Sequence, residues 1–144
     1  MLPPTKDKTP PPADRGLEEA YRAARYTVNG IPLRIGESHP DFDRWLTERS
    51  AVQYTILTAH NPRSTPLHPP VNEARHATLL KLLDQLRLDY VSARGEDPAG
   101  EWPAEEGICL LNLRPNEALQ IAVLYQQHAV VQGERGGVPR LVWV

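Results

Sequence analysis

The most constraining feature of this sequence is a run of seven residues without a charged side chain, Gln53–Ala59. It reads Gln-Tyr-Thr-Ile-Leu-Thr-Ala and combines β-branched with aromatic residues. Such a run is typical of a central strand that is buried on both faces of a sheet. Prolines at positions 62, 66, 69 and 70 follow it, so the chain leaves this strand through an irregular loop. The predicted architecture is built around this strand.

Four other stretches are predicted to be helices. The strongest pattern lies at residues 70–87, where Pro70 suits a first turn and leucines recur at helical spacing: Leu79, Leu80, Leu82, Leu83 and Leu86. Shorter helices are expected at residues 17–25 and 40–49. A helix at residues 115–126 has little polar face, so we expect it to be largely buried.

Further strands are predicted on both sides of the central one. Asn29-Gly30 separates the β-prone segments 26–28 and 33–35, which is a strong hairpin signal because both residues tolerate a positive φ. Other strands are expected at residues 90–93, 107–113, 128–131 and 140–144. Strands and helices alternate, which favours an α/β (α+β) fold, with a mixed β-sheet layered with three to four helices.

The composition places this fold in a single domain. The chain has 144 residues, which suits one domain, expected over residues 16–144. Residues 1–15 are rich in proline and charge, and we expect them to form a disordered tail that is dispensable for folding. No signal peptide or membrane-spanning run is recognised, which predicts a cytoplasmic protein without a membrane partner. A net charge of −2 argues against general nucleic-acid binding.

One cluster of polar residues is not explained by the fold alone. On a helical wheel Asn72 and Arg75 fall on the same stripe as Leu79, Leu83 and Leu86. A helix packed along its whole length would keep that stripe apolar, so the first turns are expected to overhang a cleft. Ligand clefts in open α/β sheets lie beyond the carboxyl ends of strands.

The preceding strand brings two more polar residues to that place, Thr58 and Asn61. The start of a helix carries unpaired N–H groups and a partial positive charge, and Arg75 adds a cationic fork. These features predict a site for a small anion. The structural alternative is that Asn72 caps the helix, that Asn61 makes a turn before Pro62, and that Arg75 forms an ion pair with Glu105 or Glu106.

Other catalytic and metal-binding patterns are weak. His60, His68 and His76 recur every eight residues, which is neither a helical ligand pair nor a zinc-finger spacing, so no metal is predicted. An acidic run between Glu96 and Glu106 reads mainly as a solvated loop. Glu105 is the exception, because it adjoins a predicted strand and is a candidate general base or metal ligand.

The same positions carry a family resemblance. The segment from Thr58 to Pro62, then Asn72 and Arg75, then Gly95-x-x-Pro98-x-Gly100-x-Trp102 with Glu105, then Gln127-x-Ala129, resembles the bacterial family catalogued as domain of unknown function 3293. The resemblance covers about residues 50–143. It implies no activity or cofactor, but it adds Trp102, Glu105 and Gln127 to the site. His60 departs from the family pattern, which usually has an aromatic residue there.

Three hypotheses follow for the function. The first is a binding module for a small polar or anionic ligand, such as a nucleotide-like one, in a cleft between strand 53–59 and helix 70–87. Thr58, Asn61, Asn72, Arg75, Trp102 and Gln127 would then contact the ligand. The second is a hydrolase-like enzyme with Glu105 as base or metal ligand. The third is an interaction module in which these residues form a structural polar network.

Overall fold

A computed structural model describes residues 15–144 of the chain. It contains helices α1 (Arg15–Ala23), α2 (Pro40–Glu48), α3 (Pro69–Gln85) and α4 (Pro115–Leu124), and a short 3-10 turn η2 (Pro62–Ser64). The strands are β1 (Arg25–Val28), β2 (Ile31–Leu33), β3 (Gln53–Thr58), β4 (Tyr90–Glu96), β5 (Glu105–Leu111), β6 (Ala129–Glu134) and β7 (Arg140–Trp143). The predicted tail lies almost entirely outside the described residues.

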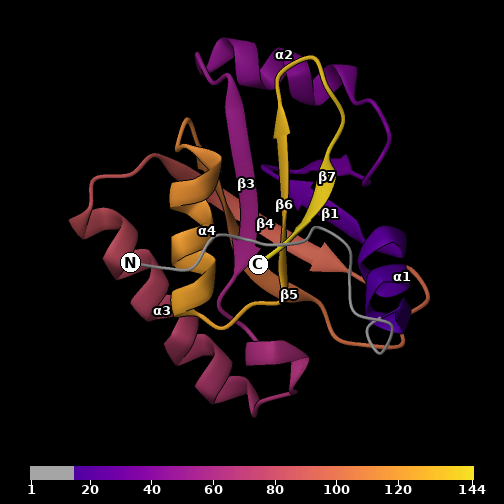
Figure 1. The fold of residues 1–144 in the computed structure, drawn as a ribbon, viewed down its shortest axis with the longest axis vertical. Helices are drawn as coiled ribbons and strands as arrows, with labels where there is room; N and C mark the ends of the chain where they lie inside the picture. The colour runs from indigo at the N-terminus through magenta and orange to yellow at the C-terminus, as the bar shows by residue number, and fades with distance from the viewer. Residues whose placement is uncertain (1–14) are drawn as a thin grey trace.

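The seven strands form one sheet in the order β2-β1-β4-β5-β3-β6-β7. This arrangement confirms a single α+β domain with four helices (Figure 1). The expectation of a mixed sheet is corrected, because all six strand pairs of the described residues are antiparallel.

The reason for this lies in the two helical crossovers. Helix α3 connects β3 to β4, and helix α4 connects β5 to β6, so both crossovers join strands that run in the same direction. Each time one antiparallel strand is inserted between the connected pair: β5 lies between β3 and β4, and β3 lies between β5 and β6. The alternation of helices and strands is therefore real, but it produces no parallel pair.

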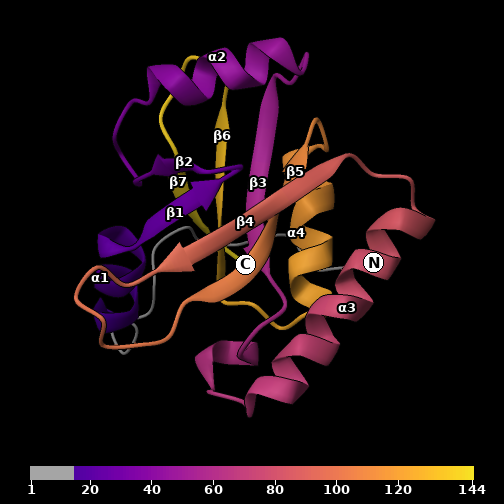
Figure 2. The ribbon, with the colours of Figure 1, turned by 180° about the vertical axis from the view of Figure 1, so that it is seen from behind.

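The sheet is curled, and its two edges meet. The backbone N–H of Gly36, after β2, donates to the carbonyl of Pro139, before β7, at 2.8 Å. Both ribbon views show β7 close to the β1–β2 hairpin (Figures 1 and 2). Strands β5 and β3 lie very close at Gly107, because a Cβ at this position would collide with the backbone oxygen of Leu57. Only glycine permits this close approach of β5 to β3.

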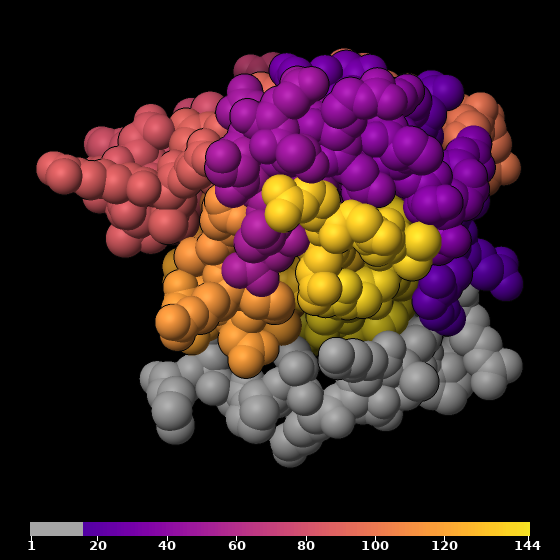
Figure 3. Space-filling model, turned by 90° about the horizontal axis from the view of Figure 1, so that it is seen from above, coloured from indigo at the N-terminus to yellow at the C-terminus, as the bar shows by residue number. Residues whose placement is uncertain are grey.

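Each face of the sheet has its own core. The inner face of the curl carries Tyr26, Val28, Tyr54, Ile56, Cys109, Leu111 and Val131, packed with Phe42, Trp45 and Leu46 of α2. The outer face carries Leu57, Ile108, Leu110, Val130 and Val142, packed with residues of α3 and α4. Helix α2 covers the upper end of the molecule in Figure 1, and Figure 3 shows that end from above. The opposite, lower end of the sheet lies next to α1.

Most predicted elements are found within a few residues of their expected bounds. Pro40, Pro69 and Pro115 stand at the start of three helices. The predicted helix stripe is correct at Leu79 and Leu83, which are fully buried, but Leu86 is 53% exposed because α3 has ended one residue earlier. Helix α4 is less covered than predicted, since Leu124 at its end is 67% exposed. No helix among residues 15–144 has the length and apolar character to cross a membrane.

Candidate functional site

Asn61 is the centre of the polar cluster. It follows β3 in the left-handed conformation, with φ of 48°, which asparagine adopts more readily than most residues. Its side-chain Oδ1 accepts the backbone N–H of Leu67 at 3.0 Å and Nδ2 of Asn72 at 2.7 Å. Its backbone N–H donates to Oδ1 of Asn72 at 2.9 Å, and its Nδ2 donates to Oε2 of Glu105 at 3.1 Å. One asparagine therefore connects the end of β3, the start of α3 and the start of β5.

These bonds fix the orientation of the Asn61 amide. Its oxygen receives two donors, and a flipped amide would lose both hydrogen bonds and turn its NH₂ group toward them. The Nδ2 group must therefore face Glu105. In this arrangement Oε2 of Glu105 is the acceptor, which favours Oε1 as the oxygen that carries a proton.

Glu105 lies on the inner face of the sheet at its lower end. Strand pairing places Tyr26 opposite Gly95, and Gly95 opposite Glu105, so these three residues form one row across β1, β4 and β5. Gly95 has no side chain, and a Cβ there would be 3.5 Å from the Tyr26 ring. We call Tyr26, Thr58, Asn61, Gly95 and Glu105 the Glu105 rim. No side chain separates Tyr26 from Glu105 along this row.

The carboxyl of Glu105 has few partners. Burial raises its pKa from 4.5 to about 7, and the hydrogen bond from Asn61 opposes this rise. Among residues 15–144 no basic group forms an ion pair with it, and Oε1 has no hydrogen-bond partner there. Near neutral pH this carboxyl therefore exchanges a proton readily.

The nearest arginines of the sheet belong to the other face. Arg25 pairs with Glu96 at 3.0 Å, and Arg94 pairs with both Glu96 at 3.2 Å and Glu106 at 3.0 Å. These four residues alternate with Tyr26, Gly95 and Glu105 along their strands, so they lie on the outer face. Strand alternation thus separates Glu105 from the basic groups beside it in the sequence.

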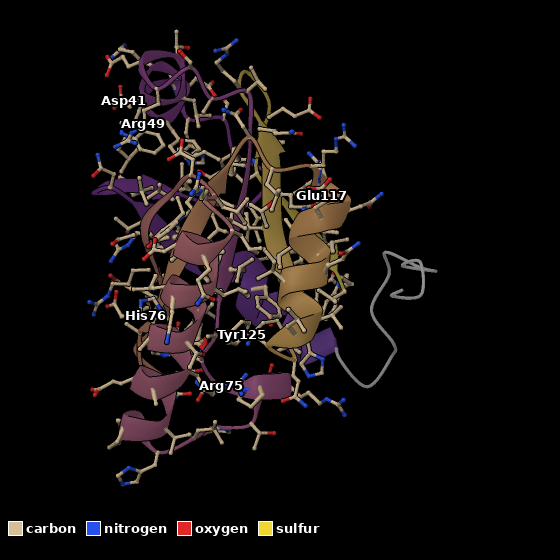
Figure 4. All side chains as sticks on the ribbon, turned by 90° about the vertical axis from the view of Figure 1, so that its left-hand side faces the viewer. Asp41, Arg49, Arg75, His76, Glu117 and Tyr125 are labelled. Atoms are coloured by element: carbon tan, nitrogen blue, oxygen red, sulfur yellow. The ribbon has the colours of Figure 1, made fainter. Side chains whose placement is uncertain are left out.

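Arg75 does not pair with Glu105. Its Nε donates to the carbonyl of Ala59 at 2.7 Å, and its Nη2 donates to the carbonyl of Tyr125 at 2.8 Å. Its guanidinium also lies 5.6 Å from the centre of the Tyr125 ring, and Figure 4 shows both side chains between α3 and the end of α4. The proposed ion pair with Glu105 or Glu106 is therefore wrong: Arg75 joins the end of β3 to the end of α4 through backbone carbonyls.

Gln127 and Thr58 make similar contacts. Nε2 of Gln127 donates to the carbonyls of His60 at 3.0 Å and Tyr125 at 3.1 Å. The Thr58 hydroxyl donates to the carbonyl of Glu106 at 2.6 Å and accepts the N–H of His60 at 3.1 Å. Both side chains hold the segment that carries Asn61. Together with Asn72 and Arg75 they form a network whose partners are mostly internal.

Trp102 lies apart from this network. It is partly buried and packs against the inner core, in the loop between β4 and β5. That loop is shaped by Asp97, whose carboxylate accepts the backbone N–H groups of Ala99 at 2.9 Å and Glu101 at 2.7 Å. Trp102 therefore reaches the inner face, as Glu105 does, but through apolar contact.

Two of the three histidines meet on the outer side. The rings of His60 and His76 are perpendicular, with centroids 6.0 Å apart. Burial, and then the neighbouring His76, lower the pKa of His60. Nδ1 of His76 is buried and has no hydrogen-bond partner within the described part of the chain. Within residues 15–144 no three His, Cys, Asp or Glu side chains form a group that could hold a metal ion.

Sequence reasoning brought together most of this cluster but missed two members. Thr58, Asn61, Asn72 and Glu105 are joined by hydrogen bonds through one loop, and Arg75 and Gln127 support that loop from the other side. Tyr26 was not predicted, because its place beside Glu105 depends on a strand order that the sequence does not display. Gly95 was part of the family motif, but no signal showed that it separates Tyr26 from Glu105.

Comparison with known proteins decides the family. The family described as "Protein of unknown function (DUF3293)" matches residues 57–130, which is about half of the chain. The chain belongs to this DUF3293 family. The match begins in β3 and ends in β6, so it includes α3, the β4–β5 hairpin, α4 and every site residue predicted from the sequence, whereas Tyr26 lies outside it. No curated protein and no solved structure matches the chain.

Proposed function

We propose that this DUF3293 protein is a binding module for a small polar ligand, which contacts Glu105 on the inner face of the sheet. The observation that supports the proposal is the Oε1 atom of Glu105. It belongs to a partly buried carboxyl, it has no partner among residues 15–144, and it is not one of the fully enclosed unpartnered atoms of that range, which are Nδ1 of His39 and Nδ1 of His76. A carboxyl that is partly withdrawn from water, with one oxygen open to contact from outside, is typical of functional sites.

The surroundings give each candidate residue a part in this proposal. Asn61 would orient the carboxyl, partly buried Trp102 would offer aromatic surface on the same face, and the Tyr26 ring would close the row beside Glu105. Asn72, Arg75, Gln127 and Thr58 would act indirectly, by holding the loop that carries Asn61. The anionic ligand expected from the sequence relied on Arg75, two of whose donor groups already meet backbone carbonyls. We therefore assign the contact with the ligand to Glu105 and not to Arg75.

A second candidate is a hydrolase-like enzyme with Glu105 as general base. It is favoured by the pKa of about 7, because a base works best when its pKa lies near the working pH. Asn61 would then hold Oε2 and leave Oε1 to take a proton from water or substrate. This candidate predicts turnover of the bound compound, whereas a binding module returns it unchanged.

A thermal-shift screen with matched variants tests the proposal. Purified wild type, Glu105→Gln and Glu106→Gln are screened against the same collection of polar metabolites. Glu106 is the control, because it is adjacent in sequence but faces outward and pairs with Arg94. A ligand at 100 times its Kd stabilises the folded state by about 2.7 kcal/mol.

The expected result is a compound that stabilises wild type and Glu106→Gln but not Glu105→Gln. Mass analysis of that compound after incubation separates binding from turnover. If every stabilising compound acts equally on Glu105→Gln, the proposed site is wrong, and the internal network remains the sole role of these residues.

A further inference from the structure

We infer that the ligand group which meets Glu105 is a primary ammonium ion carried on a small apolar or aromatic body. This inference rests on the proposed function and names the chemistry of its ligand. It is the reverse of the anion that the sequence suggested.

The first argument is the charge of the inner face. Glu105 is the one charged residue at the inward positions of the seven strands. The other inward positions carry uncharged residues: Tyr26, Val28, Ile31, Leu33, Tyr54, Ile56, Thr58, Val91, Ala93, Gly95, Gly107, Cys109, Leu111, Ala129, Val131, Gly133, Leu141 and Trp143. Within residues 15–144 the strands thus place one acidic group on an apolar surface and no basic side chain beside it on that face. A ligand cation would complete this arrangement.

The second argument is that the neighbouring basic groups already have partners in ion pairs or hydrogen bonds. Arg25 and Arg94 lie on the outer face and are held by Glu96 and Glu106 at 3.0 to 3.2 Å. Arg75 is held by two backbone carbonyls on the far side of the Asn61 loop. Each would have to break existing bonds to reach Glu105. These three arginines therefore compete little for the Glu105 carboxylate.

The third argument is the shape and chemistry of the row that contains Glu105. Oε2 is occupied by Asn61, so a ligand meets Oε1, which accepts when the carboxyl is ionised. The Tyr26 ring packs across the neighbouring Gly95, 3.5 Å from where a Gly95 Cβ would lie, so no side chain separates the ring from the carboxyl along this row. A carboxylate next to an aromatic ring suits an ammonium group, because the ring also attracts cations. The adjoining apolar core suits the body that carries the ammonium.

The test uses simple probes in place of an unidentified ligand. Methylammonium, butylammonium and phenethylammonium chloride are titrated into ¹⁵N-labelled full-length protein, each beside the alcohol of the same carbon skeleton. The side-chain amide of Asn61 and the indole N–H of Trp102 report binding at the rim. The titrations are repeated on Glu105→Gln, on the control Glu106→Gln, and on Gly95→Ala, which keeps the charge and places a methyl group against the Tyr26 ring in the row of Glu105.

We expect the ammonium probes to shift both signals in wild type and Glu106→Gln, with the larger apolar bodies binding more tightly. The alcohols, and the ammonium probes on Glu105→Gln, should bind at least tenfold more weakly. Gly95→Ala should weaken binding without unfolding, because its Cβ makes an ordinary contact with Tyr26. Since the cation needs the ionised carboxyl, affinity should be roughly tenfold higher at pH 8 than at pH 6. Tyr26 and the Asn61 amide, which also face Glu105, do not change charge in this range.

Two results would overturn the inference, and they are distinguishable. If the alcohols shift Asn61 as strongly as the ammonium probes, or if Glu105→Gln keeps the ammonium affinity, the cation is wrong while binding at the rim stands. If no probe shifts either signal, the inference fails together with the binding function proposed for Glu105.

Discussion

Replacing Glu105 by glutamine should remove a pH dependence of stability that can be worked out from its surroundings. Burial raises the pKa of Glu105 to about 7 in the folded state, whereas an exposed carboxyl has a value of 4.5. The folded protein therefore binds this proton more tightly than the unfolded chain does. The contribution of Glu105 to stability is present below pH 4.5 and is lost as the pH rises through 7.

The size of the effect follows from the interval between the two pKa values. At about 1.4 kcal/mol per pH unit, it amounts to about 3 kcal/mol between pH 4.5 and pH 8. Glutamine has nearly the same shape, and its oxygen can accept the hydrogen bond of Asn61, but it never ionises. We therefore expect Glu105→Gln to match wild type near pH 4.5 and to be more stable by about 3 kcal/mol at pH 8.

Urea denaturation followed by tryptophan fluorescence, at half-unit steps from pH 4.5 to 8.5, measures this difference. Subtracting the two curves cancels the other titrating groups, including the histidines. Glu106→Gln is the control, because the Glu106 side chain is 51% exposed and paired with Arg94, so its difference from wild type should stay within about 1 kcal/mol at every pH. A difference between Glu105→Gln and wild type that does not change from pH 5 to pH 8 would refute the buried, unpaired state of this carboxyl.

Three other substitutions test the fold and the network. Leu83→Ala, at a fully buried position of α3, should reduce the free energy of unfolding by about 2–5 kcal/mol in a denaturant titration. Arg75→Met should cost several kcal/mol, about 1–3 for each backbone carbonyl that loses its donor, and adding Glu105→Met should not restore it, since the two residues are not paired. Gly107→Ala should lower the melting temperature through its collision with the adjacent strand, whereas Gly95→Ala should leave it nearly unchanged.

The local elements could be predicted because their signals are local. Asn29 and Gly30 have φ of 49° and 81°, as the turn of a tight hairpin requires, and the sequence displays both residues directly. The proline at the start of each of three helices is equally visible. Strand order is different, because β5 and β3 insert between strands that are neighbours in the chain. Nothing in a single strand's pattern specifies such an insertion.

The candidate site likewise combines features that could be predicted from the sequence with features that could not. The helical wheel placed Asn72 and Arg75 near the end of β3, and both do contact that segment. Their partners could not be predicted, because Arg75 binds backbone carbonyls, which every residue possesses. The pairing of Asn61 with Glu105 spans 44 residues and depends on the close approach of β5 to β3. Only the three-dimensional arrangement shows that Arg75 supports the loop, and that Glu105 has no ionic partner among residues 15–144.

The approach of the sheet's two edges has a consequence for aggregation at high protein concentration. An exposed edge strand invites a strand from another molecule, which is a common start of aggregation. Here β2 has only three residues and contains Pro32, and the N–H of Gly36 is already bonded to Pro139 beside the other edge. An intruding strand would find few open donors on β2 and would meet the Gly36–Pro139 contact beside it. The short, proline-containing β2 and this contact thus disfavour self-templated association at that edge of the sheet.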